Sequence, residues 1–177
     1  MGKPLMTDDK PPFRADIVGS FLRPAALKAA REKFLGPQTP DQNLGPHDNA
    51  DLRAVEDRCI RDLIALQQRV GLKVATDGEF RRRSWSMEQV MSWDGFTANR
   101  TGASDVMWRS AKGPTQASTQ LSITKKIGWR PSATVRAFQF LKANTKATPK
   151  VTMPAPCMMH GRGAVLPLQH CQCGPLP

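Results

Sequence analysis

The chain has 177 residues, a formal net charge of +11 and four cysteines. This length suits one domain with a real core. No apolar run approaches the roughly 20 residues of a membrane-spanning helix. The first ten residues contain acids and lack the apolar core of a signal peptide. The cysteines show no secreted disulfide framework. We therefore expect a cytoplasmic protein with reduced thiols and no membrane partner.

A charge of +11 favours nucleic acids or anionic surfaces as partners, through the summed electrostatic field. The basic residues are, however, spread along the chain, and no helix-turn-helix, zinc-finger or RNA-recognition signature accompanies them. The densest run is Arg81, Arg82 and Arg83. We expect no specific nucleic-acid partner, and a basic nucleic-acid-associated protein is kept as an alternative hypothesis.

In the first half of the chain, a polar leader over residues 1–12 precedes a predicted strand over 14–18. A short helix over 23–34 begins near Pro24 and is ended by Gly36, and a loop follows over 38–49. Apolar residues at steps of three and four predict the clearest helix over 51–70: Leu52, Val55, Cys59, Ile60, Leu63, Ile64, Leu66 and Val70. Gly71 is a natural C-cap, and a strand is predicted directly after it over 72–76.

The second half is predicted to contain a short helix over 84–90 and a long loop excursion over 93–116. A strand over 120–127, a helix over 132–144 and a strand over 150–153 follow. This alternation of strands and helices is typical of a parallel α/β enzyme, in which functional residues lie at the carboxyl ends of strands.

Two segments end strand-like stretches with small or polar residues: Ile17-Val18-Gly19-Ser20, and Asp77-Gly78-Glu79 with the arginines after it. The Ser20 hydroxyl and the N–H groups around Gly19 can hydrogen-bond a substrate carboxylate, and glycine allows close approach. The Glu79 carboxylate suits an α-ammonium group. Alternatively, Ser20 is a turn serine that satisfies its own loop, and Glu79 pairs with one of the following arginines.

Three blocks in register carry a family resemblance: residues 13–24, residues 77–82 and residues 148–156. Together they resemble the cobalamin-independent methionine synthase family, in particular its single-barrel relatives that match only the C-terminal catalytic domain. The resemblance runs in order from about Pro12 to about Arg162.

The fold that this resemblance implies is a TIM (β/α)8 barrel, which needs roughly 250 residues. We therefore interpret residues 13–160 as an incomplete barrel of about the first four βα units, from a truncated gene, a frameshift or a partial sequence. Residues 161–177 have no helical or strand period, which is typical of an out-of-frame tail, the alternative being a genuine short C-terminal extension. Unpaired edges of a half-barrel predict self-association.

The activity that the resemblance implies is transfer of a methyl group from a methylated folate to the zinc-held thiol of a homocysteine-like amino acid. By resemblance, Val18, Gly19, Ser20 and Glu79 bind that amino acid, while Asp77 replaces a family histidine. We expect the three arginines to be solvated on the surface. Alternatively, they bind an anionic partner such as the glutamate tail of a folate. One of the four tryptophans could stack on a pterin ring, although we expect their side chains to lie in the core or to cover it: Trp85, Trp93, Trp108 and Trp129.

The zinc ligands that the resemblance implies belong to the later part of the barrel, so we assign no metal ligand and no catalytic residue to this chain. Zinc-compatible donors occur late, but their spacing does not match the family pair: Cys157, His160, His170, Cys171 and Cys173. A non-catalytic remnant without a function of its own is a further alternative.

Overall fold

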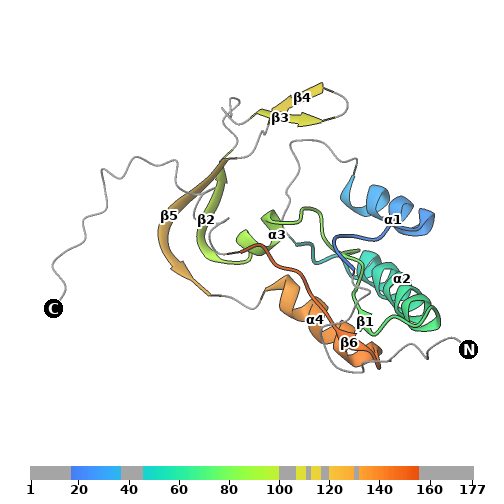
Figure 1. Ribbon diagram of the computed structural model, residues 1–177. Helices are drawn as coiled ribbons and strands as arrows, with labels where there is room; N and C mark the ends of the chain where they lie inside the picture. Colours follow the sequence, from blue (N-terminus) through green and yellow to red (C-terminus); the bar gives the residue numbers. More distant parts are fainter. Residues whose placement is uncertain are drawn as a thin grey trace, which may run out of the picture. The chain divides into compact units, whose positions relative to one another are not determined.

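The structure, a computed structural model, describes residues 17–36, 46–99, 107–110, 113–116, 120–129 and 132–155. In order, the elements of this mixed α/β fold are α1 (Ala25–Leu35), α2 (Ala50–Arg69), β1 (Val74–Ala75), α3 (Met87–Val90), β2 (Asp94–Asn99), β3 (Met107–Ser110), β4 (Gly113–Gln116), β5 (Gln120–Gly128), α4 (Ala133–Asn144) and β6 (Thr148–Pro149) (Figure 1). They form two compact units. The first contains α1, α2, β1, α4 and β6, and the second contains α3 and β2 to β5.

The helices predicted over 23–34, 51–70 and 132–144 are confirmed as α1, α2 and α4, and side-chain capping defines the starts of α2 and α4. The Asn49 side chain accepts a hydrogen bond from the Leu52 N–H at 2.8 Å at the start of α2, and Gly71, with φ +82°, follows its end. The Ser132 hydroxyl caps α4 by accepting from the Val135 N–H at 3.2 Å. The shortest predicted helix, over 84–90, is reduced to the four residues of α3.

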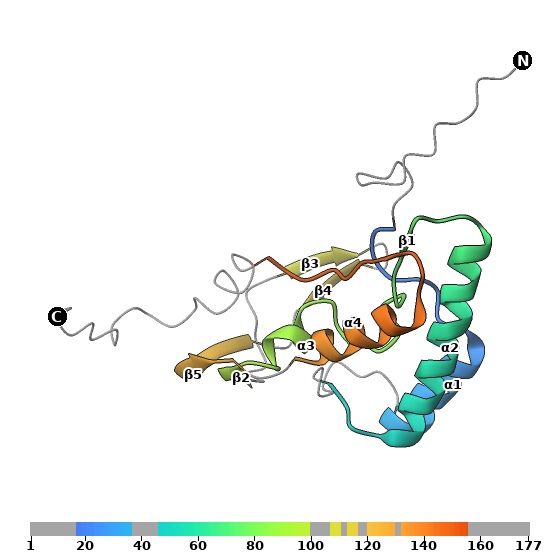
Figure 2. The same ribbon diagram turned by 90° about the horizontal axis from the view of Figure 1, so that it is seen from below.

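The core of the first unit lies where α1 and α4 pack against α2 (Figure 2). The buried residues come from all three helices, β1 and the segment after it: Leu27, Leu52, Cys59, Ile60, Leu63, Ile64, Ala75, Phe80 and Leu141. The predicted stripe on α2 is wrong at its end, because Leu66 and Val70 are exposed. Glu56 and Gln67 occupy buried positions on this helix instead. Two polar side chains are therefore buried in the main core.

The first unit contains one parallel strand pair, β1 with β6. The Thr148 N–H donates to the Lys73 carbonyl at 3.0 Å, and the Lys150 N–H donates to the Ala75 carbonyl at 2.9 Å. The prediction of a strand over 150–153 is wrong, since pairing ends at this point. The chain after β1 turns away at Gly78, so the Thr152 carbonyl accepts from the Arg82 side chain in place of a strand N–H.

The predicted strand over 14–18 is not present at Ile17 and Val18, and residues 14–16 lie outside the described residues. The Ile17 carbonyl accepts a hydrogen bond from Lys150 Nζ at 2.7 Å. Val18 is exposed. This segment is therefore tied to the sheet by a side chain.

In the second unit, β2 pairs antiparallel with β5, and β3 pairs antiparallel with β4. The prediction of a loop over 93–116 is therefore wrong where this segment forms the strands β2, β3 and β4. Gly95 lies at a bulge in β2 with φ +93°, and a Cβ there would be 2.7 Å from the Lys125 carbonyl oxygen. Only glycine fits this close approach between strands.

The predicted strand over 120–127 is confirmed as β5, but its partner is β2 and the pairing is antiparallel. Among the described strands, β1 and β6 are the only parallel pair. The expected series of four parallel strands is therefore not seen in this part of the chain.

The leader over 1–12 and the tail over 161–177 lie outside the described residues. No described helix is both long enough and apolar enough to cross a membrane.

Candidate functional site

A buried glutamine fastens the carboxyl end of β1 to α2. The Gln67 amide accepts from the Thr76 N–H at 3.0 Å and donates to the Thr76 carbonyl at 2.9 Å. The side chain thus satisfies both backbone groups of Thr76, as a neighbouring strand would. It fixes the point from which residues 77–83, named here the Glu79 loop, leave the sheet.

The Glu79 loop begins with two consecutive left-handed residues. Gly78 has φ +68°, and Glu79, with φ +56°, is the one non-glycine residue with positive φ among the described residues. The turn is held locally, because Thr76 Oγ1 accepts from the Gly78 N–H at 3.1 Å and Asp77 Oδ1 accepts from the Glu79 N–H at 3.0 Å. Left-handed backbone in a non-glycine residue is strained and often occurs at functional sites.

The Glu79 carboxylate lies against Thr152, which follows β6. Thr152 Oγ1 donates to Glu79 Oε1 at 2.8 Å, and Arg82 Nη1 lies 3.2 Å from the same oxygen. Among the described residues, both contacts are to Oε1, so Oε2 is left for a ligand. The Glu79 side chain is 15% exposed, so such a ligand would meet a partly desolvated carboxylate.

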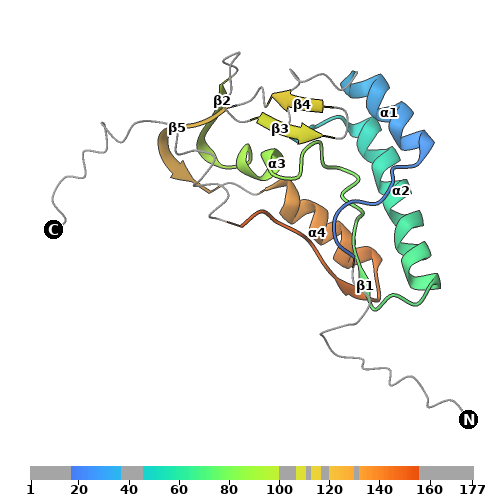
Figure 3. The ribbon, with the colours of Figure 1, turned by 45° about the horizontal axis from the view of Figure 1, so that its top comes forward.

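The predicted carboxylate-binding segment lies beside the Glu79 loop. The Phe21 N–H donates to the Gly78 carbonyl at 3.2 Å, which joins the residue after Ser20 to the residue before Glu79. Figure 3 shows the chain before α1, in dark blue, running along the chain that follows β1. Val18, Gly19 and Ser20 are all exposed, and nothing lies within 4 Å of a Cβ built on Gly19. The structure therefore brings the four predicted site residues to one edge of the first unit.

The expectation that all three arginines are solvated is wrong for Arg81 and Arg82, whose side chains are 15% and 13% exposed. Arg81 forms an ion pair with Asp57 at 2.5 Å and lies over the Phe140 ring, 4.8 Å from its centre. Arg82 donates to Thr152 and pairs with Glu79. The prediction that Glu79 pairs with one of these arginines is thus confirmed, and the pair leaves Oε2 open.

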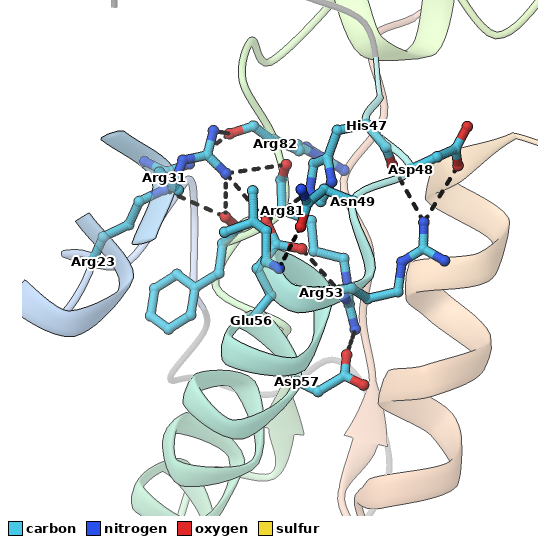
Figure 4. Close-up of polar contacts among 12 residues, drawn as sticks. Arg23, Arg31, His47, Asp48, Asn49, Arg53, Glu56, Asp57, Arg81 and Arg82 are labelled. Atoms are coloured by element: carbon cyan, nitrogen blue, oxygen red, sulfur yellow. Dashed lines mark hydrogen bonds and ion pairs between the residues drawn. The ribbon is translucent and has the colours of Figure 1, made fainter. Parts of the chain in front are cut away.

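The sequence did not predict a charged cluster that contacts the Glu79 loop through Arg81. Arg31 of α1 and Arg81 of the loop both reach Glu56 of α2, at 3.3 Å and 3.4 Å, and His47 lies 3.1 Å from the same carboxylate (Figure 4). Glu56 is 1% exposed. A sequence signal existed, because Glu56 stands one helical turn from Leu52 and from Ile60, on the apolar face of the predicted helix.

The structure adds none of the remaining sequence candidates to the described residues of this site. Trp85 and Trp129 are exposed, Trp93 packs on Phe96 with ring centres 5.9 Å apart, and the Trp108 side chain lies outside the described residues. The late cysteines and histidines also lie outside them: Cys157, His160, His170, Cys171 and Cys173.

An open cavity of about 490 Å³ lies at the opposite end of the two parallel strands from Glu79. Its lining residues precede β1 and β6 or begin β6: Gln68, Gly71, Leu72, Lys73, Lys146, Ala147 and Thr148. Ligands of open parallel sheets bind at the carboxyl ends of strands. We therefore place the candidate site at the Glu79 loop and not in this cavity.

Comparison with curated proteins relates the chain to two proteins of Bacillus subtilis. It is 35% identical over 159 residues to the uncharacterized protein YxjG of Bacillus subtilis, and 35% identical over 152 residues to the uncharacterized protein YxjH of the same organism. These matches span 87% and 85% of this chain but 38% and 37% of the relatives. The chain thus spans less than two fifths of the curated relatives it matches. No protein-family model matches it.

Among solved structures, the chain is similar to a candidate vitamin-B12-independent methionine synthase from Listeria monocytogenes. The two share 32% sequence identity with a TM-score of 0.61, over 86% of this chain and 39% of the Listeria chain. This agreement of fold and sequence supports a methionine synthase-like relationship.

Proposed function

We propose that this chain carries the amino-acid-binding part of a methyltransferase of the cobalamin-independent methionine synthase type. The acceptor would be an amino-acid thiol of the homocysteine class, and the donor a methylated folate. The observation that carries the proposal is the Glu79 carboxylate, which follows β1 with one oxygen held and the other open. The similarity to the Listeria protein supports it.

In the proposed complex, Glu79 Oε2 accepts a charge-assisted hydrogen bond from the α-ammonium group of the amino acid. Arg82 and Thr152 hold Oε1 and so fix the direction of the carboxylate. The Ser20 hydroxyl and the backbone N–H groups near Gly19 bind the α-carboxylate, with Val18 beside them. The amino acid is thus oriented at both of its charged groups, and its side chain extends away from the loop.

We further propose that β1 and β6 belong to a TIM barrel whose remaining strands correspond to the rest of the relatives' length. In the part of the chain that the structure describes, no group of three His, Cys, Asp or Glu side chains fits a zinc ion. No step of the methyl transfer is therefore assigned to a metal held by these residues. Their proposed role is to bind and orient the amino acid.

Titration calorimetry of the full chain with L-homocysteine tests the proposal through Glu79→Gln. Loss of the charge leaves the ammonium group poorly paired, so binding should weaken by roughly 2–5 kcal/mol, or at least about 30-fold in Kd. The matched control is Glu32→Gln, since Glu32 is an exposed glutamate of α1. It should leave Kd unchanged. Equal binding by Glu79→Gln and wild type would show that Glu79 is only a partner of Arg82.

A chimera tests the same proposal in a complete chain. Residues 1–160 would replace the matching part of the Listeria monocytogenes protein, and methyl transfer to L-homocysteine would be measured with a methylated folate as donor. We expect an active chimera whose activity falls with Glu79→Gln and not with Glu32→Gln. An inactive chimera that folds cooperatively would contradict the proposed activity.

A further inference from the structure

Two arginines from the α1 side hold the backbone of the Glu79 loop. Arg23 Nη2 donates to the Glu79 carbonyl at 2.9 Å and to the Arg82 carbonyl at 2.8 Å. Arg31 donates from Nη1 to the Phe80 carbonyl at 3.0 Å and from Nη2 to the Arg82 carbonyl at 3.2 Å. Arg31 Nη1 also lies 3.4 Å from the Arg81 carbonyl, so four carbonyls of one short loop accept hydrogen bonds from a pair of guanidinium groups. Figure 4 shows Arg23 and Arg31 beside Arg81 and Arg82.

The Arg31 guanidinium is buried, and a buried charge needs a partner close by. Glu56 supplies it, because Arg31 Nη1 lies 3.3 Å from Glu56 Oε1 and the two side chains are 9% and 1% exposed. Glu56 belongs to α2 and Arg31 to α1. Through this pair, two packed helices hold the donor groups that the loop carbonyls need.

The left-handed conformation of Glu79 requires such support. A non-glycine residue with φ +56° is held in place only when its surroundings outweigh the strain. The Glu79 carbonyl accepts a hydrogen bond from Arg23, and the next carbonyl along the chain, that of Phe80, accepts one from Arg31. If they were released, the backbone could relax, and the Glu79 carboxylate would turn away from Thr152.

We propose that Arg31, held by Glu56, is a positioning residue for ligand binding by Glu79. It fixes the backbone of the Glu79 loop so that the carboxylate presents Oε2 to the ligand, while it touches no ligand itself. This inference rests on the proposed function for its ligand. The positioning of the loop can be measured without the ligand.

The Arg31→Lys variant tests whether the arrangement of donors in the Arg31 guanidinium matters in addition to its charge. Lysine keeps the positive charge beside Glu56, but its compact ammonium lacks the rigid planar fork of donors with which a guanidinium spans several carbonyls. We expect L-homocysteine to bind about 10- to 100-fold more weakly, the effect of displacing a binding group by about 1 Å. Amide hydrogen exchange should accelerate at residues 79–82 and stay unchanged in α4.

The matched control is Arg53→Lys. Arg53 also pairs with a carboxylate, Asp48, at 3.4 Å, but this pair is exposed, and the other hydrogen bond of Arg53 goes to the His47 carbonyl. It should change neither affinity nor exchange. A purely structural role for Arg31 would lower the unfolding free energy and accelerate exchange throughout the first unit, α4 included, which would overturn the proposal.

Unchanged affinity and unchanged loop exchange in Arg31→Lys would also overturn it. If wild type binds no L-homocysteine, the proposed function fails, and exchange alone decides whether Arg31 positions the loop: acceleration confined to 79–82 supports it, and any other pattern refutes it. If Arg31→Lys does not fold, Arg23→Lys takes its place, because Arg23 donates to the same loop from an incompletely buried position.

Discussion

Replacing Gly78 with alanine tests whether the Glu79 loop depends on close packing against α2. A Cβ at this position would lie 2.4 Å from Leu63 Cδ2 and 3.1 Å from the Phe80 ring. The residue also has φ +68°. Leu63 and Phe80 are both buried, so neither can move freely away from the added methyl group. We expect Gly78→Ala to destabilise the fold through strain and through overpacking.

Gly71→Ala is the matched control, because it separates these two causes. Gly71 has φ +82°, but nothing lies within 4 Å of its added Cβ. Both variants incur a left-handed strain of roughly 1–2 kcal/mol. Only Gly78→Ala adds the overpacking cost, about 1–3 kcal/mol. Its free energy of unfolding should therefore fall by about 2–5 kcal/mol in total, which exceeds the loss in Gly71→Ala.

Urea denaturation followed by circular dichroism measures both losses. A double-mutant cycle with Leu63→Val identifies the contact, since valine removes the δ carbons that the new methyl group would meet. Gly78→Ala should cost less in that background. If Gly78→Ala and Gly71→Ala are equally destabilising, the loop is not packed against Leu63 as the structure has it, and this reasoning is refuted.

Three further predictions concern the core and the site. Gln67→Leu leaves the N–H and carbonyl of Thr76 unpaired, so it should lower the free energy of unfolding by roughly 2–5 kcal/mol in urea melts, while Gln68→Leu at an exposed position should not. Burial raises the pKa of the Cys59 thiol, so the folded state keeps a proton that the unfolded chain loses. The free energy of unfolding should therefore fall as pH rises above about 8.5. Urea melts at pH 8 and pH 10 should show a smaller fall in Cys59→Ala than in wild type, and an equal fall would contradict the assignment. Ser20→Ala should leave the exposed site segment folded and weaken L-homocysteine binding by about 0.5–1.5 kcal/mol in calorimetry, the contribution of one hydrogen bond. Undiminished binding would make Ser20 a turn residue only.

The helices could be predicted because their determinants are local. Asn49 and Ser132 each accept a hydrogen bond from an N–H three residues along the chain, and apolar residues recur at helical spacing. The strands were harder, because a strand depends on a partner that the local pattern does not name. Thus the sequence pattern predicts β5 as a strand, whereas its antiparallel partner β2 lies in a segment whose composition predicts a loop.

The sequence by itself therefore determined the helices, the turn at Gly78 and the residue types of the candidate site. Only the tertiary structure decided what Glu79 contacts, because Thr152 lies 73 residues further along the chain. It likewise decided that Glu56 is buried with Arg31, 25 residues away, and not solvated. Charges so distant in sequence meet only when α1 and α2 pack together, and that packing holds the loop in its strained conformation.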